Sequence, residues 1–220
     1  MEGQLSILHL MAKEEQVSVD APRATSPAGR AFADEASRGL IAACQHGDRQ
    51  AFQQLFELYK DRVYSVAMHY FNGDEGSAKD VTQQVFLKLF AKISQFHYDA
   101  GFGTWLYRVV ANACLDEQRR RRKFVSVDEA TGASQLRVRA SQHRELEQSE
   151  IADTVRTAIS ELRPKLRLPI LLKYVEGLSY EEIAASLGCS QGTVASRLNR
   201  GHKALAQKLS HLRKTLMSKV

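Results

Sequence analysis

Cysteine is scarce in this sequence, and so are the spacings that bind metals. Cys44, Cys114 and Cys189 are the three cysteines among 220 residues, and they lie far apart without CxxC or His/Cys ligand spacing. An odd number of distant cysteines argues against a disulfide framework, so we expect reduced, mostly buried thiols in a cytoplasmic protein. We expect neither a metal site nor a cofactor.

Long apolar runs and catalytic spacings are missing as well. No stretch approaches the roughly 18 uninterrupted apolar residues of a membrane helix, and Met1 is followed by Glu2 rather than by the basic start of a signal peptide. No phosphate-cradling glycine loop occurs, and the histidines lack partners at ligand or triad spacing. This holds for His46, His69, His97, His143, His202 and His211. We expect a soluble, unexported protein that is not an enzyme.

Positive charge is present in excess, and it is clustered. The formal net charge is +6, yet no Asp or Glu occurs from Ile183 to the C-terminus. The cations of that segment are Arg197, Arg200, Lys203, Lys208, Arg213, Lys214 and Lys219. An unopposed positive field favours a polyanion, with nucleic acid as the first partner to consider and an anionic membrane surface as the second.

Residues 178–198 have the spacing of a helix-turn-helix. Apolar or small side chains share one face of the first helix at Ile183, Ala184 and Leu187. Gly188 supplies the positive φ that ends this helix, and Ser190 caps the next one. Val194 and Leu198 point inward at i, i+4, whereas polar side chains suited to base edges and phosphates point outward. These are Gln191, Thr193, Ser196, Arg197 and Arg200. The alternative is an ordinary helical hairpin.

The rest of the chain predicts two all-α units. Residues 1–36 mix Ala, Pro, Ser, Arg and Glu, which is typical of a flexible arm. Residues 37–123 show helical spacing, and residues 124–149 are polar and weakly patterned, as in an interdomain linker. A second helical unit follows over residues 150–212, and no alternating segment predicts a strand.

Three helices are expected in the first unit. The first has its core face at Phe52, Leu55, Phe56, Tyr59, Val63, Val66, Ala67 and Tyr70. The second is expected to start near Ser77 or Ala78, with Val81, Val85, Phe86, Leu89, Phe90 and Ile93 inward. The third starts near Thr104 and ends in the five cations of residues 119–123.

That third helix has two occupied faces. Leu106, Val109, Val110 and Ala113 form one, and Trp105, Arg108, Asn112, Asp116 and Arg119 form the other. The second face offers stacking, hydrogen bonding and phosphate neutralisation to nucleic acid. Alternatively, Trp105 closes the core, Asp116 pairs with Arg119 or Arg120, and the cationic run is a solvated helix end or a nuclear-localisation patch.

Several segments resemble one family. They are residues 78–87 (AKDVTQQVFL), 102–112 (FGTWLYRVVAN), the arginines 119–122, residues 174–184 (YVEGLSYEEIA) and 192–194 (GTV). In this order they are similar to bacterial sigma factors of the sigma-70 family, of the extracytoplasmic-function (ECF) group. The resemblance covers about residues 37–209, and the N-terminal arm departs from many members, which begin almost directly at region 2.

The resemblance implies that the first unit is sigma region 2, which docks on the β′ clamp helices of core RNA polymerase and reads and melts the −10 element. Polymerase-binding residues would be Asp80, Gln83, Gln84 and Phe86. The −10 residues would be Phe96, His97, Phe102, Trp105, Arg108, Asn112, Arg119 and Arg120. A glycine-containing loop beside an aromatic and a cation suits a flipped base.

The second unit then resembles region 4, which contacts the β flap and places its recognition helix in the −35 element. Its DNA residues would be Ser190, Gln191, Thr193, Ser196, Arg197, Arg200 and Lys203. The linker would thread the polymerase RNA channel. The family further implies an anti-sigma factor as partner and a role in a stress or envelope response. A stand-alone helix-turn-helix regulator, which would need a sensor pocket or symmetric interface, stays open from the residues alone.

Overall fold

The structure is a computed structural model that describes residues 38–128 and 146–210. Its helices are α3 (Arg49–Tyr70), α4 (Glu75–Lys92), α5 (Phe102–Asp128), α6 (Leu146–Ser160), α7 (Pro164–Tyr174), α8 (Tyr180–Leu187) and α9 (Gln191–Lys208), with the 3-10 turn η1 (Ile93–Gln95) after α4. Residues 38–45 are helical too, and no strand occurs in these ranges. The all-α expectation is confirmed, while the expected arm over residues 1–36 lies outside the described residues.

Aspartates start the first two long helices. The carboxylate of Asp48 accepts hydrogen bonds from the backbone at the start of α3, and Asp74 does the same at the start of α4. Asn72 and Gly73, both with positive φ, form the turn between these helices. Because Asp74 is the cap, α4 begins at Glu75, slightly before the expected Ser77.

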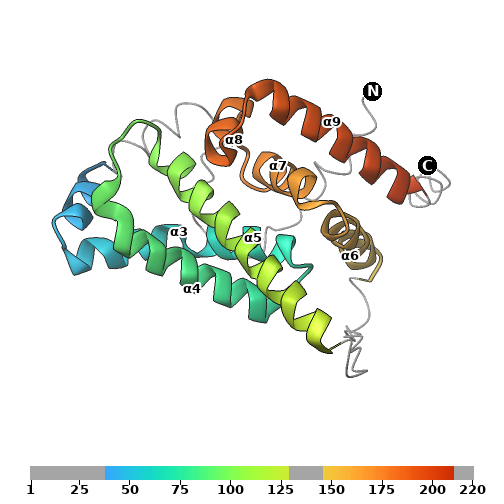
Figure 1. Cartoon of the computed structure of the whole chain (residues 1–220), viewed down its shortest axis with the longest axis horizontal. Helices are drawn as coiled ribbons and strands as arrows, with labels where there is room; N and C mark the ends of the chain where they lie inside the picture. The colour runs from blue at the N-terminus through green and yellow to red at the C-terminus, as the bar shows by residue number, and fades with distance from the viewer. Residues whose placement is uncertain (1–37, 129–145, 211–220) are drawn as a thin grey trace.

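The core stripes of α3 and α4 face each other, and α5 packs on α4 with a lighter contact to α3 (Figure 1). Leu55, Val63 and Val66 of α3 have no exposed surface, and neither have Val85 and Leu89 of α4. Helix α5 begins at Phe102 rather than Thr104. It continues to Asp128, beyond the expected end of the unit, so the connection before α6 is shorter than the expected linker.

The second unit holds the helix-turn-helix. Ser179 caps α8 in a capping box with Glu182, and Gly188 ends it with φ 60°. Ser190 caps α9 by accepting from the Thr193 backbone. Val194 and Leu198 are buried, so the expected inward face of the second helix is confirmed.

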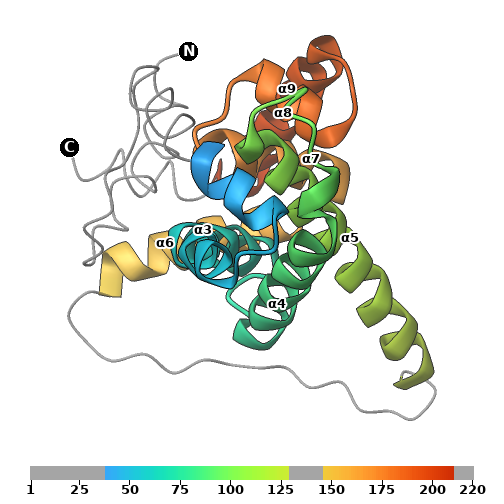
Figure 2. The same cartoon turned by 90° about the vertical axis from the view of Figure 1, so that its left-hand side faces the viewer.

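The two units pack against each other. Helix α8 lies on the N-terminal half of α5, while α6 and α7 contact α3 (Figure 2). Helix α9 packs on α7 and α8 at the outer side of this assembly (Figure 1). The described residues therefore form one closed body in which residues far apart in sequence meet.

Candidate nucleic-acid and polymerase interfaces

The outward face of α9 is polar, cationic and accessible. Gln191, Ser196 and Arg200 are exposed, and Thr193 and Arg197 are half-buried. Within the described part of the chain, no carboxylate is a hydrogen-bond or ion-pair partner of these five side chains. Arg200 donates to the Ser196 carbonyl at 3.3 Å, and Arg197 lies 3.7 Å from the Cys189 sulfur. Such weakly held guanidinium groups remain available to phosphates or base edges.

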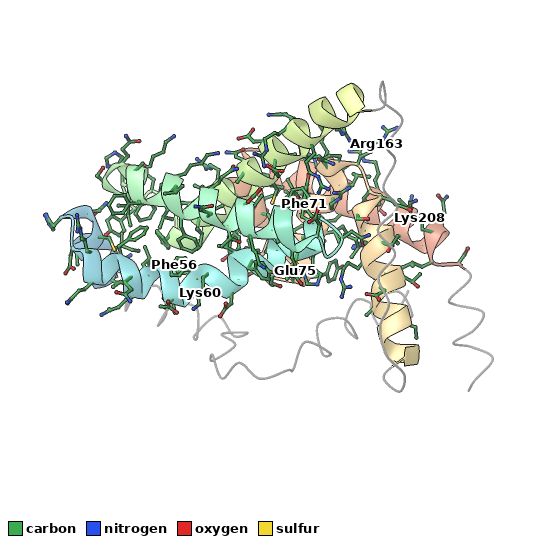
Figure 3. The ribbon with its side chains drawn as sticks, turned by 90° about the horizontal axis from the view of Figure 1, so that it is seen from below. Phe56, Lys60, Phe71, Glu75, Arg163 and Lys208 are labelled. Atoms are coloured by element: carbon green, nitrogen blue, oxygen red, sulfur yellow. The ribbon has the colours of Figure 1, made fainter. Side chains whose placement is uncertain are left out.

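The start of α9 is capped by a serine side chain. Ser190 Oγ accepts from the Thr193 amide at 3.2 Å and lies 2.9 Å from Thr193 Oγ1. The positive end of the helix dipole also lies at this turn. Lys203 is exposed about three turns further along. Lys208 lies at the far end of α9 (Figure 3) and pairs with Glu161 of the connection after α6.

The polar strip of α5 is divided between solvent and α8. Asn112 is exposed, whereas the Arg108 guanidinium donates to the Ala185 carbonyl of α8 at 2.7 Å. Trp105 is half-buried, 5.4 Å from Phe96 and 5.8 Å from Phe102 between ring centroids. The alternative that Trp105 closes the core is therefore only partly correct, because Trp105 packs on two core rings but is only half-buried.

Carboxylates of α4 and α5 neutralise much of the arginine run. Arg119 pairs with Asp116 at 3.3 Å, as the alternative interpretation expected, and this pair is exposed. Arg120 lies 3.2 Å from Asp80 and 2.8 Å from the buried Glu117, the latter without the alignment of a hydrogen bond. These ion pairs reduce the repulsion between neighbouring arginines. Their stabilisation is small, because exposed pairs contribute at most about 1 kcal/mol.

Arg121 is held more firmly. It pairs with Asp74 at 2.9 Å, donates to Ser77 Oγ at 2.9 Å, and lies over the Phe71 ring. This guanidinium anchors α5 to the start of α4. Arg121 therefore has a structural role, although the sequence pattern predicted that all five cations of residues 119–123 are available to nucleic acid or solvent.

The loop before α5 rests on an aromatic cluster. Phe96 and Phe102 are 5% and 3% exposed, with ring centroids 5.6 Å apart. Neither ring is available to a ligand in this arrangement, so their predicted contact with DNA would be indirect. His97 is exposed, as that prediction requires.

On α4 the predicted polymerase-binding residues differ in accessibility. Asp80 and Gln83 are exposed and Gln84 is half-buried. Phe86 is 5% exposed because its ring packs edge-on against Phe56, with ring centroids 4.7 Å apart. A direct role for Phe86 therefore does not fit its position, which is that of a core residue supporting the helix.

The cysteines are packing residues with no redox arrangement. Cys44 and Cys114 are buried and Cys189 is half-buried; all three are free thiols. Burial raises the pKa of Cys114 to about 12, so the reactive thiolate is not populated near neutral pH. Within residues 38–128 and 146–210 no group of His, Cys, Asp or Glu could hold a metal ion, and no helix is long and apolar enough to cross a bilayer.

Comparison with known proteins assigns both units. Residues 55–124 match sigma-70 region 2, and residues 152–205 match sigma-70 region 4. The ECF RNA polymerase sigma-E factor of Escherichia coli is 34% identical over 183 residues, which cover 79% of this chain and 94% of that protein. The chain belongs to the ECF sigma factors. The RNA polymerase sigma-H factor of Pseudomonas aeruginosa is similar too, at 33% identity over 186 residues, 81% of this chain and 96% of that one.

Solved structures agree on the fold of this ECF sigma factor. The sigma factor RpoE of Bartonella quintana, in complex with the anti-sigma factor NepR, matches with a TM-score of 0.58 at 24% identity, over 72% of this chain and 96% of that chain. CnrH in complex with the cytosolic domain of CnrY also gives 0.58 at 24% identity, over 79% and 97%. These structures support the all-α fold, and the family matches together with the relatives of 33% and 34% identity confirm the sigma-factor interpretation of the sequence.

Three exposed side chains of this sigma factor were missed by sequence reasoning. Leu87 and Phe90 are 62% and 59% exposed on α4, beside Gln83 at i+4 and i+7. The expectation that Phe90 is a core residue is wrong. Its ring packs on Phe52 of α3 at the edge of the α3–α4 pair and leaves most of its own surface in solvent. Tyr98, in the loop before α5, is 41% exposed and has φ 59°, which is rare for a bulky residue. The spacing of Gln83, Leu87 and Phe90 could have predicted that they share one face of α4. Nothing in the sequence predicted the positive φ of Tyr98.

Proposed function

We propose that this ECF sigma factor recruits core RNA polymerase and reads a promoter with two separate units. Residues 37–123 recognise the −10 element and residues 150–212 the −35 element. The observation that carries this proposal is the outward face of α9, which is polar and cationic, accessible, and set on a capped helix-turn-helix. Linking two weak readers raises the effective concentration of the second to about the millimolar range.

At the −35 element, α9 would lie in the major groove. Its N-terminal turn meets base edges and phosphates, and its cations farther along meet the backbone. The residues are Ser190, Gln191, Thr193, Ser196, Arg197, Arg200 and Lys203.

At the −10 element, exposed groups of α5 and of the preceding loop would contact the melted strand. Asn112, Arg119 and Arg120 supply hydrogen bonds and charge, while His97 and Tyr98 are accessible for stacking on an extruded base. Phe96, Phe102 and Trp105 would position this loop, and Arg108 would contact DNA once released from α8.

The polymerase would bind the exposed face of α4. Asp80, Gln83 and Gln84 provide polar contacts around the apolar side chains of Leu87 and Phe90, and such apolar centres with polar rims are typical of protein interfaces. Phe86 holds this face from beneath.

Further partners follow from the relatives. The similar RpoE structure contains the anti-sigma factor NepR, and we propose that this chain is likewise held inactive by such a partner until a stress or envelope signal. It would act in the cytoplasm, where core polymerase is, and it would leave bond formation to the polymerase. The relatives give no support to a stand-alone regulator.

The test is start-site selection. Purified chain and core polymerase are incubated with a promoter library, and transcript 5′ ends are mapped. Transcripts starting downstream of two shared elements support the proposal. Tight binding to palindromic duplexes without polymerase, together with no transcripts above core enzyme alone, would instead favour the regulator.

A further inference from the structure

A glutamine ties the first described helix to the segment that leads from α4 to α5. Gln45 is the last residue of the helix of residues 38–45, and its side chain is half-buried. Its Nε2 donates to the carbonyl of Ile93 at 3.0 Å and to the carbonyl of Phe96 at 2.8 Å. An amide nitrogen carries two hydrogens, so both bonds form at once. Figure 1 shows this helix, in blue, beside the green segment that it contacts.

Packing fixes the position of Gln45. Ile41 and Cys44 of the same helix are buried in the core. Directly after Gln45 the chain turns at Gly47, which has φ 85° and whose amide donates to the Cys44 carbonyl at 3.0 Å. The helix is therefore held on its core face and at its end. Its last side chain supports the carbonyls from a fixed backbone.

The loop held in this way carries the groups that we propose to stack on an extruded base. Phe96 ends η1, and its carbonyl on Gln45 is the first anchor of the loop. The second anchor is the Gly101 carbonyl, which accepts from a backbone amide in the first turn of α5 at 3.2 Å. His97 and Tyr98 lie between the two anchors, and both are exposed.

The backbone of Tyr98 is in a conformation that needs such support. Its φ is 59°, and its ring packs on that of Phe96 with centroids 4.7 Å apart. A bulky residue stays in this left-handed region only where its surroundings fix it, and such residues are typical of ligand-binding segments. The carbonyl that Gln45 holds lies two residues before Tyr98. Without the Gln45 bonds, the peptide that follows Phe96 would be free to rotate, and Tyr98 would return to an ordinary φ.

We propose that Gln45 is a positioning residue for the −10 element, which keeps the loop in the conformation that presents His97 and Tyr98 to an extruded base. The inference rests on the proposed function, since base capture by this loop is part of it. Gln45 itself does not touch DNA in this proposal. It acts because a loop that is already ordered loses less conformational entropy on binding, and because affinity falls with the fraction of molecules in the binding conformation.

A comparison of intact and abasic DNA tests the proposal with the full chain bound to core polymerase. A promoter selected from the library is prepared with its −10 region as a mismatched bubble. The non-template strand is either intact or has one abasic site, placed at each −10 position in turn. Affinities are measured by competition with labelled intact DNA. At the captured base the parent chain should bind the abasic DNA at least about fivefold more weakly, because stacking is lost.

Replacing the glutamine should remove this discrimination. Gln45→Met has no donor, so we expect it to bind the intact DNA about fivefold more weakly while its affinity for the abasic DNA stays close to that of the parent. Gln45→Lys keeps a nitrogen donor and should retain most of the discrimination. The matched control is Gln54→Met, which changes an exposed glutamine of α3 and should leave the discrimination at the value of the parent.

The outcomes separate positioning from stability and from the proposed function. Unchanged discrimination in Gln45→Met would overturn the proposal. So would equal weakening on intact and abasic DNA, which is the result of a general loss of stability, and so would equal loss in Gln45→Met and Gln45→Lys. If the parent chain itself shows no position that is sensitive to an abasic site, the proposed base capture is contradicted, and the role of Gln45 with it.

Discussion

Replacing Gly201 by alanine sets two known effects against each other in the helix that would read the −35 element. Alanine in a helix interior is favoured over glycine by about 0.5–1 kcal/mol. A Cβ at Gly201, however, would lie 3.1 Å and 3.2 Å from two carbons of Ile170 on α7. Ile170 has no exposed surface, so it has little room to move, and overpacking of this kind costs about 1–3 kcal/mol. We expect Gly201→Ala to lower the free energy of unfolding by about 1 kcal/mol.

The measurement is urea unfolding of the full chain, followed by far-ultraviolet circular dichroism. Gly192→Ala is the matched control, because a Cβ there meets only Ser190 Oγ, at an ordinary 3.9 Å. This control should raise the free energy of unfolding by up to about 0.5 kcal/mol. If Gly201→Ala stabilises the protein as much as Gly192→Ala does, then α9 and α7 are not in the close contact described.

Three further results are expected. Replacing Arg197 and Arg200 by alanine should weaken −35 binding by the holoenzyme and flatten its logarithmic salt dependence by about 0.9 for each phosphate that is no longer neutralised. Replacing Asp80 and Gln83 by alanine should lower affinity for core polymerase about tenfold in a titration, with helicity unchanged, because both side chains are exposed. Burial lowers the pKa of His202, so its stabilising contribution is full above the unfolded value of about 6.5 and is lost as the pH falls through the lower folded value; His202→Gln should flatten this decline in urea unfolding.

Each of these three predictions has a control variant and a result that would contradict it. Lys165→Ala removes an exposed cation outside α9 and should leave the salt slope intact; an unchanged slope in the arginine variant would remove its side chains from the phosphates. Glu75→Gln on α4 should keep polymerase affinity, whereas reduced helicity in the Asp80 and Gln83 variant would make those residues structural. His46→Gln changes an exposed histidine, and a pH profile altered equally by both histidine variants would contradict the special role of the half-buried His202.

Local features of the fold were predictable because short-range chemistry determines them. Gly188 and Ser190 set the turn of the helix-turn-helix through a positive φ and a side-chain cap, and the sequence predicted both. The helical period also predicted the buried stripe of α3. The start of α4 was placed two residues late because Asp74, a good capping residue, was assigned to a turn.

Other features depend on which face each helix presents to distant segments. Phe86 and Phe90 share a helical face by spacing, yet one ring is enclosed by Phe56 and the other lies at the edge of the hairpin. The Glu176 carboxylate accepts hydrogen bonds from Arg62 and Tyr107. These residues lie 114 and 69 positions before it in the sequence, respectively. Nothing local in the sequence signals such pairs, so the closed arrangement required the structure.

Changing the spacing between the two promoter elements tests most directly whether both units of the protein bind the promoter at the same time. Once a promoter has been selected from the library, about five base pairs are inserted between its elements, which turns one element to the opposite side of the duplex. With core polymerase and this sigma factor, initiation from the altered promoter should drop at least about tenfold, although each element is intact. Undiminished initiation from the same start site would mean that the two units do not hold both elements at once.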